Sequence, residues 1–262
     1  MIVAGCDVGS LSAEAVIMSD GSIISSEIIR VRPRPEQSAT DVMDKALARV
    51  GLTYKNIECC VSTGYGRERI PFANGNVSEL SCHGKGAQWL VPSVRTVIDV
   101  GGQDCKVIRV DENGKLINFV MNDKCAAGTG RFLEFMAKVL GVGIEDLGPL
   151  ALATERPAPI TNMCSIYAES EVLHYVYEGK NPAEIAAGIN HAMAERVNSL
   201  VKRVGVEKDI CITGGVAKNI GVVKNLEEML QVNAEALPVD PQIVGAIGAG
   251  LFAKEELSNR NK

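Results

Sequence analysis

Two segments of the chain, 1–30 and 96–121, share one pattern, and this internal repeat constrains the fold more than any other feature. Each segment begins with an apolar strand that ends in Asp-Val-Gly, and a second strand follows. An Asp-Gly or Asn-Gly turn, which favours positive φ at both central residues, then leads to a third strand. Asp7 lies 92 positions before Asp99, and the turn glycines keep this spacing to within one residue. The repeat therefore predicts two similar lobes.

Helices and buried strands follow each three-stranded unit, so we predict an α/β protein. The first lobe is expected to span 1–95, with a C-terminal helix over 241–262 that packs back on it, and the second 96–240. A cleft between two lobes is a common place for a ligand. Apolar spacing predicts helices over 36–52, 78–91, 128–142, 184–204, 222–232 and 242–256, and buried strands over 57–63 and 209–213.

Composition excludes several classes of protein. The chain has 262 residues, of which 46% are apolar and 23% charged, as in globular proteins of two domains. Its net charge of −5 argues against a nucleic-acid binder. No apolar run approaches the roughly 20 residues that span a bilayer, and the N-terminus lacks a signal-peptide pattern. We therefore expect a cytoplasmic protein, whose eight cysteines are not a disulfide framework.

Three glycine-containing turns follow predicted strands, at 7–10, 99–104 and 213–217. Glycine lets the backbone approach phosphate oxygens closely, and an aspartate at the end of a strand can hold hydrated Mg²⁺ or orient a water molecule. The chain has no G-x-x-x-x-G-K-[ST] sequence, and its first turn has no G-x-G-x-x-G, so neither a P-loop nor a Rossmann site is predicted.

These turns resemble the phosphate-1, phosphate-2 and adenosine motifs of the actin-like, hexokinase-like and Hsp70-like ATPases. The phosphate hairpins would run from Asp7 to Met18 and from Asp99 to Val110. The resemblance implies that ATP and Mg²⁺ lie between two lobes of this mixed-sheet fold. It places Asp7, Gly9, Ser10, Asp99, Gly101, Gly102, Gln103 and Asp104 near the phosphates and the metal, and Gly214, Gly215, Lys218 and Asn219 near the adenosine.

The cysteines fall into groups. Cys6, Cys59, Cys60, Cys105 and Cys211 lie in apolar strands or beside the turns, and we expect them to pack in the core. Cys82 stands beside His83 on a predicted helix, where a polar surface is favoured over a metal pair. The three histidines lie on helical stretches and are expected to pack or face solvent.

Cys125 and Cys164 each precede a helical stretch, and the free amides of a helix N-terminus stabilise a thiolate or an anionic cluster. Two cysteines cannot complete a four-thiolate site, but two chains related by a twofold axis can.

The sequence motifs around these cysteines and turns resemble one family, the ATP-dependent activators of 2-hydroxyacyl-CoA dehydratases, with the related benzoyl-CoA reductase ATPase subunits and the reductases of double-cubane cluster proteins. The motifs are NDKCAAGTGRFLE, TGYGR, SELSCHGKGA, VIDVGGQD and ITGGVAKN. The resemblance implies a homodimer with one [4Fe-4S] cluster that is bridged by Cys125 and Cys164 of both subunits. A ferredoxin or flavodoxin would reduce the cluster, and ATP hydrolysis would drive one electron to an iron-sulfur partner enzyme. Asp99 or Asp104 would orient the attacking water, with Gln103 as polar support.

Two residues depart from the family pattern. Glu14 stands in the phosphate-1 hairpin where the family usually has lysine, so it must turn away, neutralise Mg²⁺ or alter the nucleotide response. Cys105 stands where related activators commonly have alanine. Rival functions are a cluster-free small-molecule kinase, for which Glu79, Glu169 and Glu171 are acidic candidates, and a non-catalytic nucleotide sensor.

Overall fold

The structure is a computed structural model that describes residues 1–260. The chain divides into two compact units, which we describe separately. Unit 1 comprises Met1–Val97, Ile108–Asn118 and the C-terminal segment from Ala236, and unit 2 comprises Ile98–Val107 and Phe119–Glu235. In the described part of the chain, no helix is long and apolar enough to cross a membrane.

Unit 1 contains a five-stranded sheet with the order β3-β2-β1-β4-β5. Strand β1 pairs antiparallel with β2 and parallel with β4. The strands are β1 (Ile2–Val8), β2 (Ser12–Ser19), β3 (Ser22–Arg30), β4 (Cys59–Thr63) and β5 (Gly75–Asn76).

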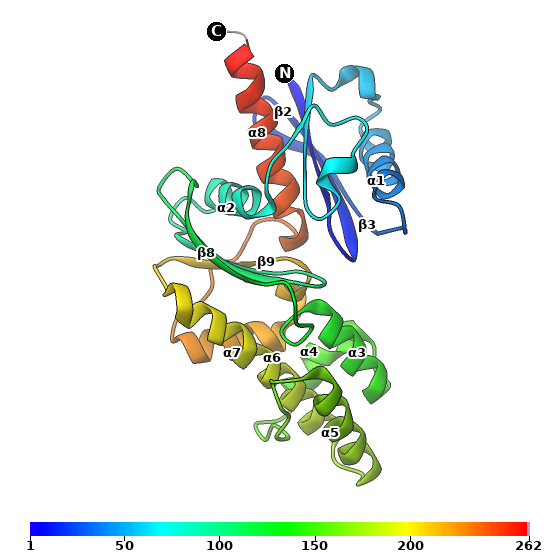
Figure 1. The fold of residues 1–262 in the computed structure, drawn as a ribbon, viewed down its shortest axis with the longest axis vertical. Coiled ribbons are helices and arrows are strands. Elements are labelled where there is room, and N and C mark those ends of the chain that lie inside the picture. Colours follow the sequence, from blue (N-terminus) through cyan, green and yellow to red (C-terminus); the bar gives the residue numbers. More distant parts are fainter. Residues whose placement is uncertain (261–262) are drawn as a thin grey trace. The chain divides into compact units, whose positions relative to one another are not determined.

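Strands β1 and β2 carry apolar side chains on both faces of the sheet. Helices therefore cover both faces. Ala4 and Ile17 pack against helix α1 (Pro35–Arg49), whereas Val3 and Val16 pack against α8 (Val244–Arg260). Helix α2 (Glu79–Leu90) packs against α8 (Figure 1). The unit also has short 3₁₀ turns at Tyr54–Asn56, Arg67–Arg69 and Pro241–Ile243.

The second sheet has the order β8-β7-β6-β9. Its strands are β6 (Thr96–Val100), β7 (Cys105–Val110), β8 (Leu116–Asn122) and β9 (Ile210–Thr213). The helices of unit 2 are α3 (Gly130–Leu140), α4 (Ile144–Ala151), α5 (Ser165–Tyr177), α6 (Pro182–Val204) and α7 (Ile220–Leu230), and a 3₁₀ turn spans Gly215–Lys218. Helix α6 is central, because α3, α4, α5 and α7 all pack against it.

The repeat predicted from the sequence is confirmed in the strand order. In each sheet, three consecutive strands lie side by side in reverse order, and a fourth strand from later in the chain lies next to the first of them. The α/β fold class and the predicted helices and strands are also confirmed, within a few residues at their ends. Helix α4 was not predicted, because Gly148 and Pro149 interrupt its helical pattern.

The predicted turn geometry is confirmed in one hairpin only. Asp20 and Gly21 both have positive φ, at 52° and 89°. In the second hairpin only Gly114 has positive φ, so the prediction of two positive angles is wrong there. The Asp111 carboxylate instead accepts hydrogen bonds from the backbone N–H groups of Asn113 and Lys115, which favours a different turn.

Candidate functional site

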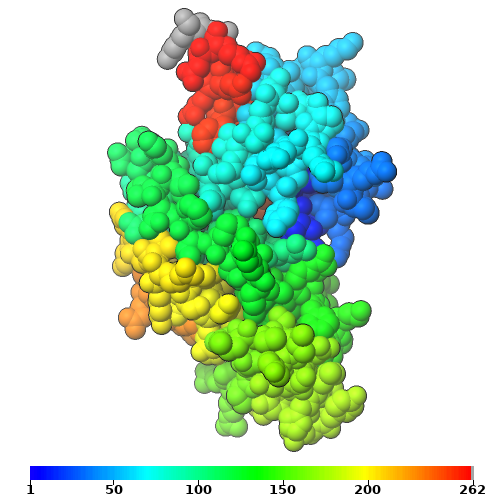
Figure 2. Space-filling view, viewed as in Figure 1, coloured from blue at the N-terminus to red at the C-terminus, as the bar shows by residue number. Residues whose placement is uncertain are grey.

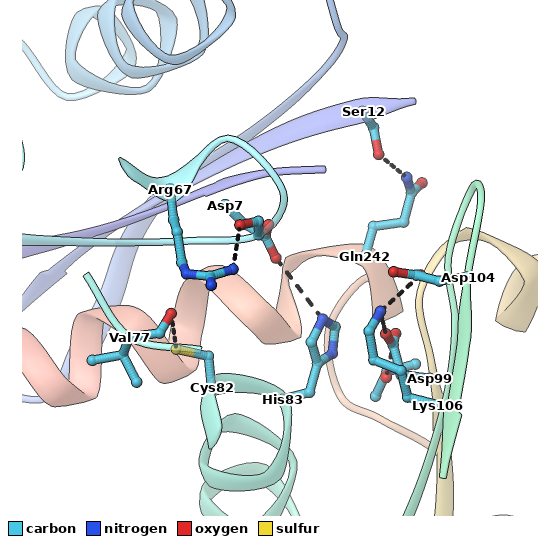
Figure 3. A network of polar contacts seen from close by, with 12 residues as sticks. Asp7, Ser12, Arg67, Val77, Cys82, His83, Asp99, Asp104, Lys106 and Gln242 are labelled. Carbon is cyan, nitrogen blue, oxygen red and sulfur yellow. Dashed lines mark hydrogen bonds and ion pairs between the residues drawn. The ribbon is translucent and has the colours of Figure 1, made fainter. Parts of the chain in front are cut away.

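Asp7 lies at the end of β1 and is 6% exposed. Its carboxylate fits between Gly64 and Gly245, where a Cβ atom on either glycine would collide with it. The Nε2 atom of His83 lies 3.8 Å from Asp7 Oδ2, and the Arg67 side chain points toward Asp7 (Figure 3). Two basic side chains thus face this buried carboxylate.

Glu14 lies opposite Asp7 in the register of β1 and β2, and it is buried. Cross-strand partners share one face of a sheet, so Glu14 lies on the face that carries Asp7. Gly9 and Ser10 form the partly exposed turn between the strands, which Gly9 closes with a 3.0 Å hydrogen bond to the Ser12 carbonyl.

The predicted polar surface at Cys82 and His83 is wrong, because both side chains are buried. Helix α8 approaches α2 closely at Gly86 and Gly248, where an added Cβ atom would collide with the backbone of the other helix. This close packing covers α2 on a side that its sequence alone does not mark as apolar.

In unit 2, Lys106 is a buried cation between two acidic side chains (Figure 3). Its ammonium group lies 3.2 Å from Asp99 Oδ2 and 2.7 Å from Asp104 Oδ1. Asp99 Oδ1 also accepts a 2.9 Å hydrogen bond from the Thr213 hydroxyl. Both carboxylate oxygens of Asp99 are thus bound by other side chains, Oδ1 by Thr213 and Oδ2 by Lys106. For Asp104, the ion pair with Lys106 is formed by Oδ1. Sequence reasoning missed Lys106, although a lysine within an apolar strand directly after GGQD was a usable signal.

The turn Gly101–Asp104 is tied to helix α3 by its backbone. The N–H groups of Gly130 and Arg131 donate to the carbonyls of Gly101 and Gly102, at 2.8 and 2.9 Å. These first amides of α3 are therefore not free, contrary to the expectation for the helix that follows Cys125. Gln103 is exposed on the turn, and Asp104 packs under Gly101.

The turn from Gly214 to Asn219 ends β9 and begins α7. Gly214 has a φ of 82°, and its Cα faces the Asp99 carboxylate and the Val100 carbonyl so closely that no Cβ would fit. Gly215 and Lys218 are at least partly exposed. Asn219 is buried, and its Oδ1 accepts from the amides of Gly221 and Val222, whereas its Nδ2 has no hydrogen-bond partner among the described residues. An unpaired buried donor is costly, so Asn219 Nδ2 is a candidate donor to an acceptor atom of a bound ligand.

Two substitutions of Asn219 are expected to separate these roles. Asn219→Ser keeps an N-cap oxygen but loses the Nδ2 donor, so ATP affinity should fall by about tenfold, the value of one hydrogen bond to a ligand. Asn219→Ala also removes the cap and should lower the free energy of unfolding by about 1 kcal/mol. Titration calorimetry and urea unfolding measure the two effects, and equal ATP affinity for wild type and Asn219→Ser would contradict the donor role.

The eight cysteines separate into six that are buried and two that reach the surface. Burial in the core raises the pKa of Cys60, Cys82 and Cys211 to about 12, and it also raises the pKa of Cys6, Cys59 and Cys105. A thiol must ionise to bind a metal, so these six are poor ligands. The core packing predicted for five of them is confirmed. Only Cys125 and Cys164 remain as candidate ligands.

Cys125 lies in the loop before α3, and Cys164 is the N-cap residue of α5. The Asn122 side chain donates to the carbonyls of Cys125 and Ala127 and shapes the first loop. Met163, Ile166 and Tyr167, beside Cys164, are exposed by 71%, 71% and 70%. The yellow-green segment of Figure 2, which contains them, lies at the surface of unit 2. These three exposed apolar side chains make the surface beside Cys164 a candidate for contact with another protein.

Comparison with known proteins relates the chain to ATPases and activators. A model of the family described as "BadF/BadG/BcrA/BcrD ATPase family" matches residues 4–253. A 2-hydroxyisocaproyl-CoA dehydratase activator from Clostridioides difficile is 41% identical, over 100% of this chain and 98% of the relative. An (R)-2-hydroxyglutaryl-CoA dehydratase activating ATPase from Acidaminococcus fermentans is 43% identical, over 95% of each. A benzoyl-CoA reductase subunit from Thauera aromatica is 32% identical, over 98% of this chain and 95% of the relative.

Solved structures agree in fold. The activator of the 2-hydroxyisocaproyl-CoA dehydratase from Clostridium difficile with bound ADPNP superposes with a TM-score of 0.95, at 40% identity, and the match covers 100% of this chain and 97% of the other. A glucokinase of the ROK family from Streptomyces griseus shares only 13% identity but has a TM-score of 0.56, over 97% and 100% of the two chains. The predicted actin/hexokinase/Hsp70-like fold class is therefore confirmed.

Proposed function

Because the chain belongs to the BadF/BadG/BcrA/BcrD ATPase family and is an ATPase, we propose that it uses ATP hydrolysis to deliver a low-potential electron to a partner iron-sulfur enzyme. The observation that carries this proposal is the separation of the cysteines: six are buried in the core, and the remaining two lie in loops that begin α3 and α5.

The two surface cysteines fit half of a [4Fe-4S] site, which takes four thiolates. Cys125 and Cys164 supply two, and no described group of three or more His, Cys, Asp or Glu side chains in this chain could complete a metal site. A twofold homodimer supplies the other two thiolates, so we propose one cluster per dimer. Such a cluster provides a one-electron carrier of low potential.

We propose that the two glycine-containing turns of unit 2 bind the nucleotide, and that the Asp7 hairpin of unit 1 binds phosphate and Mg²⁺. Gly214 and Asn219 would lie near the adenosine with Gly215 and Lys218, and Gly101 and Gly102 near the phosphates with Gln103. Hydrated Mg²⁺ fits the carboxylate of Asp7, with Gly9 and Ser10 beside the phosphates. Both oxygens of Asp99 bind Thr213 or Lys106, so Asp104 is the better candidate to orient the attacking water.

Hydrolysis can supply the energy that the electron needs. Raising one electron by a few tenths of a volt takes roughly 5–10 kcal/mol, which is the scale of ATP hydrolysis in a cell. The carbonyls of Gly101 and Gly102 accept hydrogen bonds from the first amides of α3. A movement of this turn would therefore move the helix that follows Cys125. A ferredoxin or flavodoxin is the proposed donor, and the reducing cytoplasm suits these free thiols.

The partner is proposed to be a 2-hydroxyacyl-CoA dehydratase, since the relatives with 41% and 43% identity activate such enzymes. A double-cubane cluster protein is a related partner. A role as an ATPase subunit of a benzoyl-CoA reductase is the second candidate, which the relative with 32% identity supports.

Iron analysis after anaerobic purification tests the proposal. We expect about four irons and four acid-labile sulfides per dimer and a visible absorption that dithionite bleaches. A protein that hydrolyses ATP but holds no iron would contradict electron transfer and favour a phosphoryl acceptor instead.

A further inference from the structure

We propose that His191 and Glu195 are positioning residues that couple nucleotide binding at the Gly214–Asn219 turn to the segment that carries Cys164. This inference rests on the proposed function, because it assigns nucleotide to that turn and a metal-binding role to Cys164. The coupling runs through side chains of unit 2 in the order Asn219, Asn225, His191, Glu195 and Asn162.

The first links join the turn to helix α6 through α7. Asn219 caps α7 by accepting hydrogen bonds from Gly221 and Val222, each 3.0 Å long. One turn later, Asn225 Nδ2 donates to the Gly221 carbonyl at 2.8 Å, and Asn225 Oδ1 lies 2.9 Å from His191 Nδ1 on α6. An amide oxygen only accepts, so His191 donates from Nδ1 in this contact.

The next links join α6 to the segment before α5. His191 Nε2 lies 3.6 Å from Glu195 Oε1, one helical turn away on the same face, and the two form an ion pair when both ring nitrogens of His191 carry a proton. The other carboxylate oxygen, Glu195 Oε2, accepts a 2.8 Å hydrogen bond from Asn162 Nδ2. Asn162 is two residues before Cys164, so this contact attaches the chain next to the cysteine to α6.

Ala158 packs closely on α6 at Gly188, whereas the residues nearer to Cys164 are positioned by polar contacts of side chains. The Thr161 amide donates to Glu171 Oε2 at 2.6 Å, and the Met163 amide donates to the Thr161 hydroxyl at 3.3 Å. Residues 157–161 line a cavity of about 500 Å³ with Glu171, His191 and Glu195. Beside this open cavity, the polar contacts of Thr161 and Asn162 are the ones that hold the chain just before Cys164.

The coupling to Cys164 is distinct from the backbone link to α3, which begins at the phosphate turn Gly101–Asp104. Adenosine is common to ATP and ADP, so the contacts through His191 should respond to either nucleotide. The backbone bonds to α3 begin at the turn proposed to bind the phosphates, so they should respond differently to ATP and ADP.

Hydrogen exchange of the purified protein tests the coupling. In the wild type, ADP should slow amide exchange both at residues 214–222 and at residues 161–168. In His191→Ala and in Glu195→Ala, the second segment should exchange about three- to tenfold faster and should no longer respond to ADP, because one or two hydrogen bonds that position it are lost. Residues 214–222 should still be protected by ADP, which shows that nucleotide binds.

The matched control is His174→Ala, because His174 forms the same i,i+4 pair with Glu178 on the exposed side of α5. It should behave as the wild type. Glu195→Gln should keep the coupling, since its amide oxygen can accept from Asn162 and its amide N–H can donate to the His191 ring. An ADP response at 161–168 that survives in His191→Ala and Glu195→Ala, or that is absent in the wild type, would overturn the inference. The measurement needs no iron, so absence of a cluster would refute the proposed function without deciding this coupling.

Discussion

Cys125→Ala is expected to give a colourless dimer with almost no iron, while its affinity for ATP stays at the wild-type value. Each dimer would lose two of the four thiolates that a [4Fe-4S] cluster takes, and two remaining ligands do not hold it. Cys164→Ala should have the same effect, since the six other cysteines are buried neutral thiols. Iron and sulfide analysis with the absorption spectrum measures the loss, and calorimetry measures ATP binding.

Cys105→Ala is the matched control for these two variants. Cys105 is buried beside the phosphate turn, and its pKa is raised by burial, so removing its sulfur should leave the iron content unchanged. Full iron in Cys125→Ala would refute the ligand assignment. Loss of iron in Cys105→Ala as well would show that any change near the turn disrupts the site, and the specific role of Cys125 would then be unsupported.

Asp104→Asn is expected to lower kcat for ATP hydrolysis by about 10²–10⁴-fold, the range for loss of a group that orients or accepts a proton. An asparagine keeps the shape of the side chain but cannot take the proton of the attacking water. Lys106 would keep its ion pair with Asp99, so the fold should persist. Phosphate release in single-turnover and steady-state assays measures kcat, and the KM for ATP should change much less.

Two further variants make the result for Asp104 specific. Asp99→Asn removes a buried carboxylate that binds both Thr213 and Lys106, so it should lower the free energy of unfolding by about 1–3 kcal/mol, the cost of a weakened buried hydrogen-bond network in which Lys106 still pairs with Asp104. Glu112→Gln removes an exposed negative charge from the hairpin that follows β7 and should hydrolyse ATP normally. Unchanged kcat in Asp104→Asn would remove this residue from the reaction and leave Asp99 as the candidate.

The strands and helices were largely predictable, because their signals are local. Alternating or continuous apolar residues and turn dipeptides define each element within a short window of sequence. The internal repeat further predicted that the two sheets have the same arrangement of strands. Helix α4 was missed where Gly148 and Pro149 obscured the local pattern. The prediction for the Asn113–Gly114 turn was wrong because the carboxylate of Asp111 competes for the backbone of the turn.

The site was predictable only as a set of residues. The sequence identified Asp99, Asp104 and the two glycine turns by their position after strands, and it singled out Cys125 and Cys164. It did not reveal that Lys106 lies between two carboxylates, since that contact depends on the pairing of strands in the sheet. It also misjudged Cys82 and His83, which are buried because a helix from the end of the chain packs on α2.

The sequence by itself therefore determined the element types, the duplicated sheets and the candidate ligands and carboxylates, because these follow from residue chemistry and short-range spacing. Only the tertiary structure decided which groups are partners. The acceptors of α3's first amides lie in the Gly101–Asp104 turn, and the residue that orients the segment of Cys164 lies on α6, 31 to 33 positions further along the chain. Contacts between distant segments arise from packing, and no local pattern encodes them.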